Sequence, residues 1–268
     1  MSSKINAELF NGLSDDYNSY RPKPPAVIMD ILIQLAQVQK PRLVVDIGSG
    51  TGLSTFIWAE RAYEVIGIEP NTQMRNKAKM CTAVLPNTNN VSYQEGFSTE
   101  INLPDGCSDI VTCSQSLHWM DPERTFAEAV RVLRNGGVFA AYDCDWPPTM
   151  HWKVEAAYNS LMKKVKIIEK KLGILDNLKI WSKEQHLDRM LESECFRFVK
   201  EIVVHSTESG NTERLIGILL SQEVGLLLKE GISEAEIGLD GLKAVARSTI
   251  GDKPMPWYFS YRIRFGIK

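Results

Sequence analysis

Short apolar runs alternate with amphipathic stretches through the first half of the chain. The apolar runs predict strands at residues 42–47, 64–69, 91–95, 108–113 and 137–143. The stretches between and before them have helical spacing and predict helices at 24–38, 52–62, 71–84 and 122–133. The last of these helices is expected to close on Asn135-Gly136-Gly137 as a C-cap turn. Such alternation is typical of an α/β fold with a parallel sheet and crossover helices.

The pattern changes beyond residue 143. Helical spacing predicts helices at 151–172 and 183–194 and a helical region at 211–247. Two alternating segments, Phe198–Val204 and Trp257–Phe265, predict strands with one solvated face. We expect an antiparallel strand pair at the sheet edge, with helical insertions forming a cap. The chain is then one domain with an N-terminal lid and helix (1–40), a core (41–145), cap insertions (146–196 and 207–255) and C-terminal strands (197–206 and 256–268).

A glycine-rich turn follows the first predicted strand, where Val44-Val45-Asp46-Ile47 runs into Gly48-Ser49-Gly50-Thr51-Gly52. Alternate glycines permit positive φ and leave no Cβ in the way, so backbone amides can approach a ligand closely. Glu69 ends the second apolar run, where its carboxylate could accept hydrogen bonds from both hydroxyls of a ribose or be a solvated strand end. The pair predicts a site for an adenosine-containing cofactor. Asp46 either shapes the turn by accepting amide hydrogen bonds or contacts the cofactor.

The spacing of the glycines separates two cofactor classes. Dinucleotide sites use G-x-G-x-x-G, whose third glycine packs the helix against the strand. Here the pattern is G-x-G-x-G, and we find no Tyr-x-x-x-Lys pair in a suitable place. A nicotinamide-dependent oxidoreductase therefore fits the strand, the turn and the acidic residue, but lacks the third glycine at the required spacing.

The composition and charge of the chain limit the classes of binding partner that we expect. The 268 residues are 44% hydrophobic, enough for a full core, and the formal net charge is -2. This balance disfavours nucleic acid as a partner. The sequence begins without an apolar signal core and contains no segment long enough to cross a bilayer, so we expect a cytoplasmic protein that does not bind membranes. The five cysteines lack metal-type spacing, and we expect neither a metal nor disulfides.

A longer motif, which begins at the fourth predicted strand, resembles a known protein family. Residues 108–119, which read Ser-Asp-Ile-Val-Thr-Cys-Ser-Gln-Ser-Leu-His-Trp, are followed by Phe126, Ala129, Arg131-Val132-Leu133 and Gly136-Gly137. With the glycine turn and Tyr17–Pro22, residues 17–145 resemble class I S-adenosylmethionine-dependent methyltransferases, in the small-molecule group that includes trans-aconitate methyltransferase. The resemblance implies a Rossmann-like, mostly parallel sheet, with S-adenosylmethionine as cofactor and S-adenosylhomocysteine as product. It covers none of the cap.

The resemblance also implies a set of cofactor-binding residues. The glycine turn would contact the methionine and ribose, Glu69 the ribose, and Pro70 and Phe97 the adenine, where the family often has aspartate in place of Phe97. An N-terminal lid would close over the carboxylate, with Arg21 as its bidentate partner or simply a surface residue. The full set is Tyr17, Tyr20, Arg21, Asp46, Gly48, Ser49, Gly50, Gly52, Glu69, Pro70, Phe97, Ser98, Ser114 and Gln115.

Acceptor recognition is expected from polar and aromatic residues near the last strand ends: Trp119, Asp143, Asp145, Trp146, His151 and Trp152. The tryptophans could instead seat the cap on the core. His118 could act as a general base near neutral pH or pack the loop that carries it. A lysine-rich stretch at 163–171 could attract an anionic substrate, although such stretches are usually solvated.

The predicted function is transfer of a methyl group from S-adenosylmethionine to a small molecule by in-line displacement. Positioning can supply ~7 to 11 kcal/mol of the barrier for such a reaction, so a metal or covalent intermediate is not required. A non-catalytic cofactor-binding protein remains an alternative, because a binding motif does not prove turnover. An open acceptor cavity beside the donor site would favour the enzyme. The residues specify neither the acceptor atom nor the oligomeric state.

Overall fold

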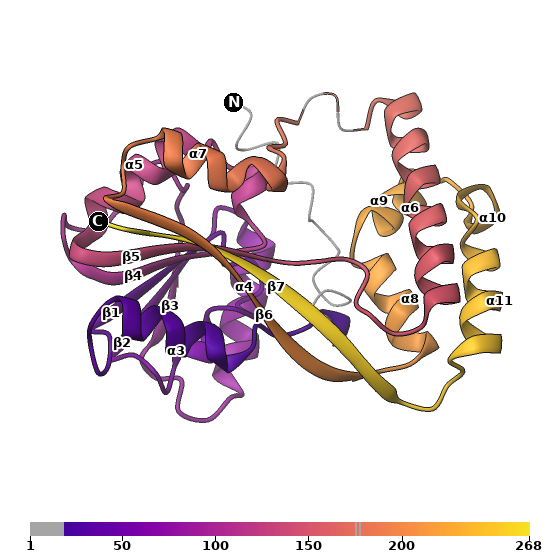
Figure 1. Ribbon diagram of the computed structural model, residues 1–268, viewed down its shortest axis with the longest axis horizontal. Helices are drawn as coiled ribbons and strands as arrows, with labels where there is room; N and C mark the ends of the chain where they lie inside the picture. The colour runs from indigo at the N-terminus through magenta and orange to yellow at the C-terminus, as the bar shows by residue number, and fades with distance from the viewer. Residues whose placement is uncertain (1–18, 175, 177) are drawn as a thin grey trace.

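The computed structural model describes residues 19–174, 176 and 178–268, so the predicted lid residue Tyr17 lies outside the described residues. These residues form a seven-stranded sheet with helices on both faces and a separate group of helices at one side (Figure 1). The strands are β1 (Leu43–Ile47), β2 (Glu64–Ile68), β3 (Val91–Gln94), β4 (Ser108–Ser114), β5 (Leu133–Cys144), β6 (Phe198–Gly210) and β7 (Met255–Ile267). The α-helices are α3 (Ala26–Leu35), α4 (Thr72–Ala83), α5 (Pro122–Val132), α6 (Trp152–Leu172), α7 (His186–Glu192), α8 (Thr212–Leu220), α9 (Glu223–Lys229), α10 (Glu234–Ile237) and α11 (Leu239–Thr249).

The strand order is β3-β2-β1-β4-β5-β7-β6. The first five strands are parallel, and β7 is antiparallel to both β5 and β6. The predicted mostly parallel sheet with an antiparallel C-terminal strand pair is therefore confirmed. The order reverses between β1 and β4, and ligands of open α/β sheets bind beyond the carboxyl ends of the strands near such a point. This topology gathers the turns after β1, β2, β4 and β5 at one edge.

The parallel strands are buried on both faces because helices cover both. Val44 of β1 and Ile110 of β4 pack with Leu32 of α3 in one apolar cluster. Their sequence neighbours point to the opposite face, where Val111 packs with Phe126 of α5 in a second cluster. Alternate residues of one strand thus serve two cores, which explains why these strands are continuous apolar runs in the sequence.

Helices α6 and α8–α11 form the cap, and their buried residues belong to the same apolar cluster as β7. The long β6–β7 strand pair reaches from the sheet to these helices, and the segment carrying α8–α11 connects the end of β6 to the start of β7 (Figure 1). Gly210 ends β6, and a Cβ there would lie 2.2 Å from the ring of Trp257, so the close approach requires glycine. The strand pair is longer than the predicted 198–204 and 257–265, because residues paired across it continue to Gly210 and Met255.

Three predicted features are wrong. Residues 52–62 form turns and a short 3-10 helix, Phe56–Trp58, because Gly52 adopts a φ of +87° and the hydroxyls of Ser54 and Thr55 bond to Asp46. The predicted C-cap turn, Asn135-Gly136-Gly137, lies within β5, where Gly136 N–H donates to the Lys268 carbonyl.

The third correction concerns α7, which was predicted as part of the cap insertion 146–196. Its residue Met190 belongs to the apolar cluster beneath α5, and Phe196 just beyond it stacks on Phe139 of β5 at 5.6 Å between ring centroids. Helix α7 lies beside α5 in Figure 1, away from the cap helices. Its apolar residues therefore cover the sheet.

His186 begins α7 and is fully buried. Burial lowers the pKa of its imidazole to about 4; Asp143 opposes this shift, while Arg264, Arg189 and Lys183 reinforce it. The folded protein therefore holds His186 neutral at pH values where the unfolded chain binds a proton.

The free energy of unfolding should consequently fall as the pH drops from about 6.5 toward 4, the window between the unfolded and folded pKa values of His186. Between pH 7 and pH 4, we expect the wild type to lose about 3 kcal/mol more than His186→Gln, which lacks the titrating group. Urea unfolding of both proteins at several pH values measures the difference. Parallel stability curves would contradict the assignment.

Candidate functional site

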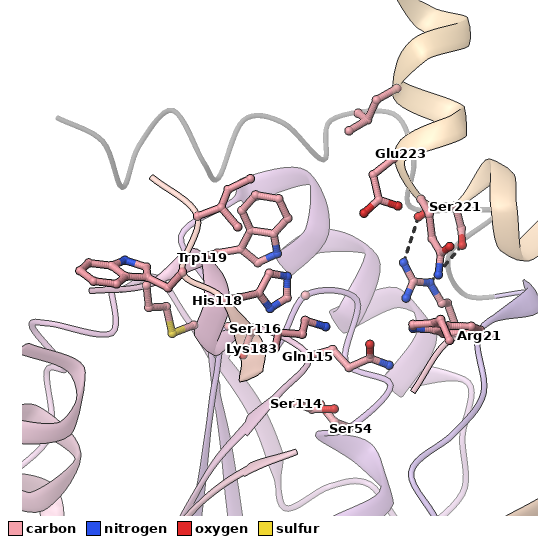
Figure 2. A pocket seen from close by; sticks show the side chains of 18 of the residues that line it. Arg21, Ser54, Ser114, Gln115, Ser116, His118, Trp119, Lys183, Ser221 and Glu223 are labelled. Atoms are coloured by element: carbon pink, nitrogen blue, oxygen red, sulfur yellow. Dashed lines mark hydrogen bonds between the residues drawn. The ribbon is translucent and has the colours of Figure 1, made fainter. Parts of the chain in front are cut away.

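A cavity of about 870 Å³ lies between the carboxyl ends of the parallel strands and the cap. One wall comes from the turns after β1, β2, β3 and β4, and the other from α6, the 180–184 segment and the α8–α9 turn. Figure 2 shows Ser114, Gln115 and His118 on the sheet side, with Ser221 and Glu223 on the cap side. The strand-end segments singled out in the sequence therefore do meet at one site.

The glycine turn after β1 forms part of the cavity floor. Gly48 and Gly50 have φ values of +67° and +55°, as the alternate glycines predicted. A Cβ on Gly48 would lie 2.5 Å from the Met120 side chain and 2.7 Å from that of Ser116, so this position needs glycine for space as well as for conformation. Ser49 lines the cavity with a buried hydroxyl that has no hydrogen-bond partner.

Asp46 lies beneath this turn. Its carboxylate accepts hydrogen bonds from Ser54 and Thr55 beyond the turn and from Thr112 of β4, at 2.6–2.8 Å. Burial raises the pKa of Asp46, and the three hydroxyl donors oppose that rise. Asp46 and Gly52, both predicted to bind cofactor, are absent from the cavity lining. The geometry supports the alternative in which Asp46 shapes the turn.

Glu69 follows β2 and faces the cavity. One carboxylate oxygen accepts from Gly50 N–H and the other from Asn71 N–H, both at 2.8 Å. Burial raises the pKa of Glu69, while the two amides and Arg75 lower it. Each carboxylate oxygen can accept two hydrogen bonds, so the arrangement leaves acceptor capacity for ligand hydroxyls. It also ties the glycine turn to the end of β2.

The predicted adenine pocket lies beside Glu69. Pro70, Phe97 and Ser98 all line the cavity, as does Gly96. The Ser98 hydroxyl shares a 2.8 Å hydrogen bond with Thr125 Oγ1 of α5. That bond fixes the Ser98 side chain, so its backbone is the better placed group for a ligand contact.

The segment after β4 forms the opposite end of the floor. Ser114 and Gln115 line the cavity, and Gln115 has a φ of +50° while its N–H donates to the Tyr142 carbonyl. His118 also lines the cavity, with a buried Nδ1 that has no hydrogen-bond partner. Burial lowers the pKa of His118 well below its usual value, and Lys183, His186 and Arg21 add to the effect. The imidazole is therefore neutral at physiological pH.

The described part of the predicted lid binds the cap. Arg21 lines the cavity, and its guanidinium donates to the Ser221 hydroxyl at 3.0 Å and the Ser221 carbonyl at 3.2 Å (Figure 2). The guanidinium also lies 5.4 Å from the centre of the Trp146 ring. Tyr20 is not part of the lining, because its ring packs over Gly217 of α8. Both residues connect the N-terminal segment to the helical insertion.

The predicted acceptor residues divide into two groups. Trp119 and Trp146 line the cavity, whereas Asp143, Asp145, His151 and Trp152 do not. The buried Asp143 carboxylate pairs with Arg264 at 3.0 Å and Lys183 at 2.9 Å, and Asp145 pairs with Arg262 at 3.2 Å.

At the start of α6, His151 Nδ1 accepts from Lys153 N–H and caps the helix, while Trp152 is 70% exposed. These contacts place the four residues in structural roles outside the cavity. We therefore withdraw them as acceptor residues.

The sequence prediction missed most of the cap wall. Lining residues of α6 recur at helical spacing, and others follow from the 180–184 segment and the α8–α9 turn. They are Tyr158, Asn159, Met162, Lys166, Glu169, Lys170, Ile180, Trp181, Ser182, Lys183, Glu184, Ser221, Gln222, Glu223 and Leu226. One sequence feature could have indicated the α6 part of this wall. Glu169 is an acidic residue in the apolar stripe of the helix, which is defined by Val154, Tyr158, Leu161 and Val165.

Residues 45–141 match the family described as a methyltransferase domain. The chain therefore contains a segment that matches the methyltransferase domain family. The predicted resemblance to S-adenosylmethionine-dependent methyltransferases is confirmed over these residues, and S-adenosylmethionine is the cofactor of that class. The nicotinamide oxidoreductase alternative receives no support from the match.

Relatives and solved structures extend the comparison. The chain is 37% identical over 121 residues to an uncharacterised methyltransferase of Mycobacterium tuberculosis, covering 45% of this chain and 46% of that protein. It is 29% identical over 128 residues, 47% of this chain and 44% of the other, to a Saccharomyces cerevisiae protein assigned as an S-adenosylmethionine-dependent methyltransferase. The chain thus matches about half the length of these relatives.

Two solved structures share the fold over nearly the whole chain. A protein of Anaeromyxobacter dehalogenans assigned to the type II methyltransferases aligns with a TM-score of 0.65 at 20% identity, covering 93% of this chain and 98% of that one. Geranyl diphosphate methyltransferase, solved with its substrate and sinefungin, aligns with a TM-score of 0.55 at 15% identity, covering 99% and 98%. At this identity the likeness shows the fold. Among the described residues, no helix has the length and apolar character needed to span a membrane.

If Glu69 holds the ribose of the cofactor, Glu69→Ala should weaken S-adenosylhomocysteine binding by about 1.5–3 kcal/mol, because it removes a charged hydrogen-bond acceptor. Calorimetric titration of both proteins measures the change. Glu95→Ala, which removes a mostly exposed carboxylate paired with Arg75 near the same strand ends, is the matched control and should bind normally. Equal affinity of a folded Glu69→Ala variant would contradict the assignment.

Proposed function

We propose that this methyltransferase-domain protein transfers a methyl group from S-adenosylmethionine to a small-molecule acceptor by in-line displacement within the cavity. The observation that carries the proposal is the size and extent of that cavity. Its 870 Å³ lies in the upper part of the roughly 300–1,000 Å³ range of small-molecule sites. It begins at the glycine turn and Glu69 and continues to the cap. Space for an acceptor beside the donor favours an enzyme over a protein that only binds the cofactor.

The floor residues fit the proposed cofactor. The buried, unpartnered Ser49 hydroxyl needs a hydrogen-bond partner, and a Cβ on Gly50 would meet nothing within 4 Å. Glu69 would hold the ribose, with Pro70 and Phe97 beside the adenine, while Ser114 and Gln115 would contact the methionine end. When bound, S-adenosylmethionine supplies an electrophilic methyl group on a positively charged sulfur.

Residues from both walls of the cavity would position the acceptor. Trp119 and Trp146 provide aromatic surface, and Met162 of α6 adds apolar surface from the opposite wall. Holding donor and acceptor in a near-attack geometry can supply ~7 to 11 kcal/mol of the barrier, which is the main task of the protein in this reaction. Arg21 would contribute by holding the cap against the N-terminal segment through Ser221.

His118 is the proposed general base for an acceptor that carries a proton. Its neutral imidazole is the form that accepts a proton, although the lowered pKa makes it a weaker base than an ordinary histidine. The alternative role is packing, and its ring lies 4.8 Å from that of Trp119. We also retain the cytoplasm as the proposed location, and a small molecule rather than nucleic acid as the partner.

Titration calorimetry of the purified protein tests cofactor choice directly. We expect saturable micromolar binding of S-adenosylmethionine and S-adenosylhomocysteine, and none of NAD or NADP, which serve as controls. Binding of a nicotinamide dinucleotide alone would overturn the proposal. Binding of the first pair with no methyl transfer in a broad acceptor screen would favour the non-catalytic alternative.

His118→Ala tests the base. If His118 accepts the proton, this variant should lower kcat by about a hundredfold or more while the cofactor Kd stays within about twofold, since general-base catalysis contributes roughly 10²–10⁴-fold. Radiolabelled methyl transfer gives kcat, and calorimetry gives Kd. A parallel loss of turnover and affinity would indicate a packing role, for which His118→Phe is the control that preserves the ring.

A further inference from the structure

Helix α6 carries an acidic residue on its buried face. Glu169 continues the apolar stripe of the helix, and the residue is only 7% exposed. It lines the cavity, and its Oε1 atom is buried with no hydrogen-bond partner. A carboxylate removed from water without a partner is strongly unfavourable, so such a group in a cavity wall points to a ligand that completes it.

The protonation of Glu169 reflects this position. Burial raises its pKa to about 7, the nearby charge of Glu223 adds to the rise, and Lys166 opposes it. Near neutral pH, both forms of the carboxyl are therefore populated. A positive charge placed beside it would favour the ionised form and remove the cause of the instability.

Glu223 brings a second carboxylate to the same wall. It is the first residue of α9, it is exposed, and it lines the cavity. In Figure 2 its carboxylate points into the open space between His118 and Arg21. Two carboxyl groups from two cap helices thus face one space, and the charge of Glu223 makes ionisation of Glu169 more costly. A cation bound near both groups would offset this cost.

We propose that Glu169 and Glu223 form a subsite that binds a cationic nitrogen, an amine or ammonium group, of the methyl acceptor. The inference rests on the proposed function and deepens it, because it names the chemical class of the acceptor. The remainder of such an acceptor would lie against the apolar side chains of Met162, Ile180 and Leu226, which line the same end of the cavity.

The lysines of α6 suggest the opposite interpretation, that the cavity binds an anionic group. Lys166 and Lys170 also line the cavity and could attract an anion. Both are exposed, however, so their ammonium groups are hydrated and need no ligand. The buried carboxyl of Glu169 has the stronger requirement for a partner, and it therefore decides the sign of charge that the subsite selects.

The test titrates the whole protein, saturated with S-adenosylhomocysteine, with two amines in a calorimeter. The probes are 2-phenylethylamine and hexylamine, with 2-phenylethanol, hexanol, phenylacetate and hexanoate as neutral and anionic counterparts. We expect at least one amine to bind about tenfold or more tightly than its alcohol and its acid. Glu169→Gln should reduce that affinity by about tenfold to a hundredfold, because it removes a charge-assisted contact. Glu223→Gln should act in the same direction, by less.

Glu230→Gln is the matched control, since it removes an exposed carboxylate of the cap outside the cavity lining and should leave amine binding unchanged. Failure of the wild type to bind S-adenosylhomocysteine would contradict the proposed function itself. With that binding intact, three results would overturn the subsite alone: no preference for either amine, tighter binding of the acids, or equal amine affinity in the wild type and Glu169→Gln.

Discussion

The carboxylate of Asp46 holds the donor end of the cavity together. From the centre of the sheet, it accepts hydrogen bonds from Ser54 and Thr55 on one side and Thr112 on the other. A buried carboxylate is tolerated only when its hydrogen-bonding capacity is met, so the hydroxyl side chains and Asp46 depend on one another. The glycine turn lies directly between these partners. The same hydrogen bonds fix the position of the turn relative to β1 and β4 and divert residues 52–62 from an α-helix.

Much of the fold could be predicted from sequence because the parallel strands are buried on both faces. Val44 and Val45, for example, point to opposite cores, and this produces the continuous apolar runs that mark each strand. The hydrophobic pattern was less informative where side-chain hydrogen bonds compete with regular backbone hydrogen bonding. Ser54 and Thr55 divert residues 52–62 from helix, and the Gly136 contact with the last residue of the chain has no local signal.

The cavity lining could be predicted from sequence on the sheet side and much less so on the cap side. Gly48 and Glu69 directly follow β1 and β2, and Ser114 ends β4. These three strands are neighbours in the sheet, so the topology alone brings such positions together. The cap wall depends on how α6 and the α8–α9 turn pack across the cavity. That packing joins segments far apart in the sequence, so local sequence patterns do not reveal it. Asp143 illustrates the limit, because its place after a strand suggested a ligand contact while its actual partners, Lys183 and Arg264, are distant in sequence.

The methyltransferase match ends at residue 141, and this boundary falls almost where the cavity changes from one wall to the other. Apart from Arg21, Pro22 and Pro24, the sheet wall of the cavity is encoded within the matched segment, while the cap wall is encoded by the two insertions around β6. Under the proposed function, changes in the insertions can therefore alter what is methylated without disturbing the sheet wall. Two proteins with the same core can diverge in chemistry through the cap alone, so shared ancestry in residues 45–141 carries information about the methyl source and little about its destination.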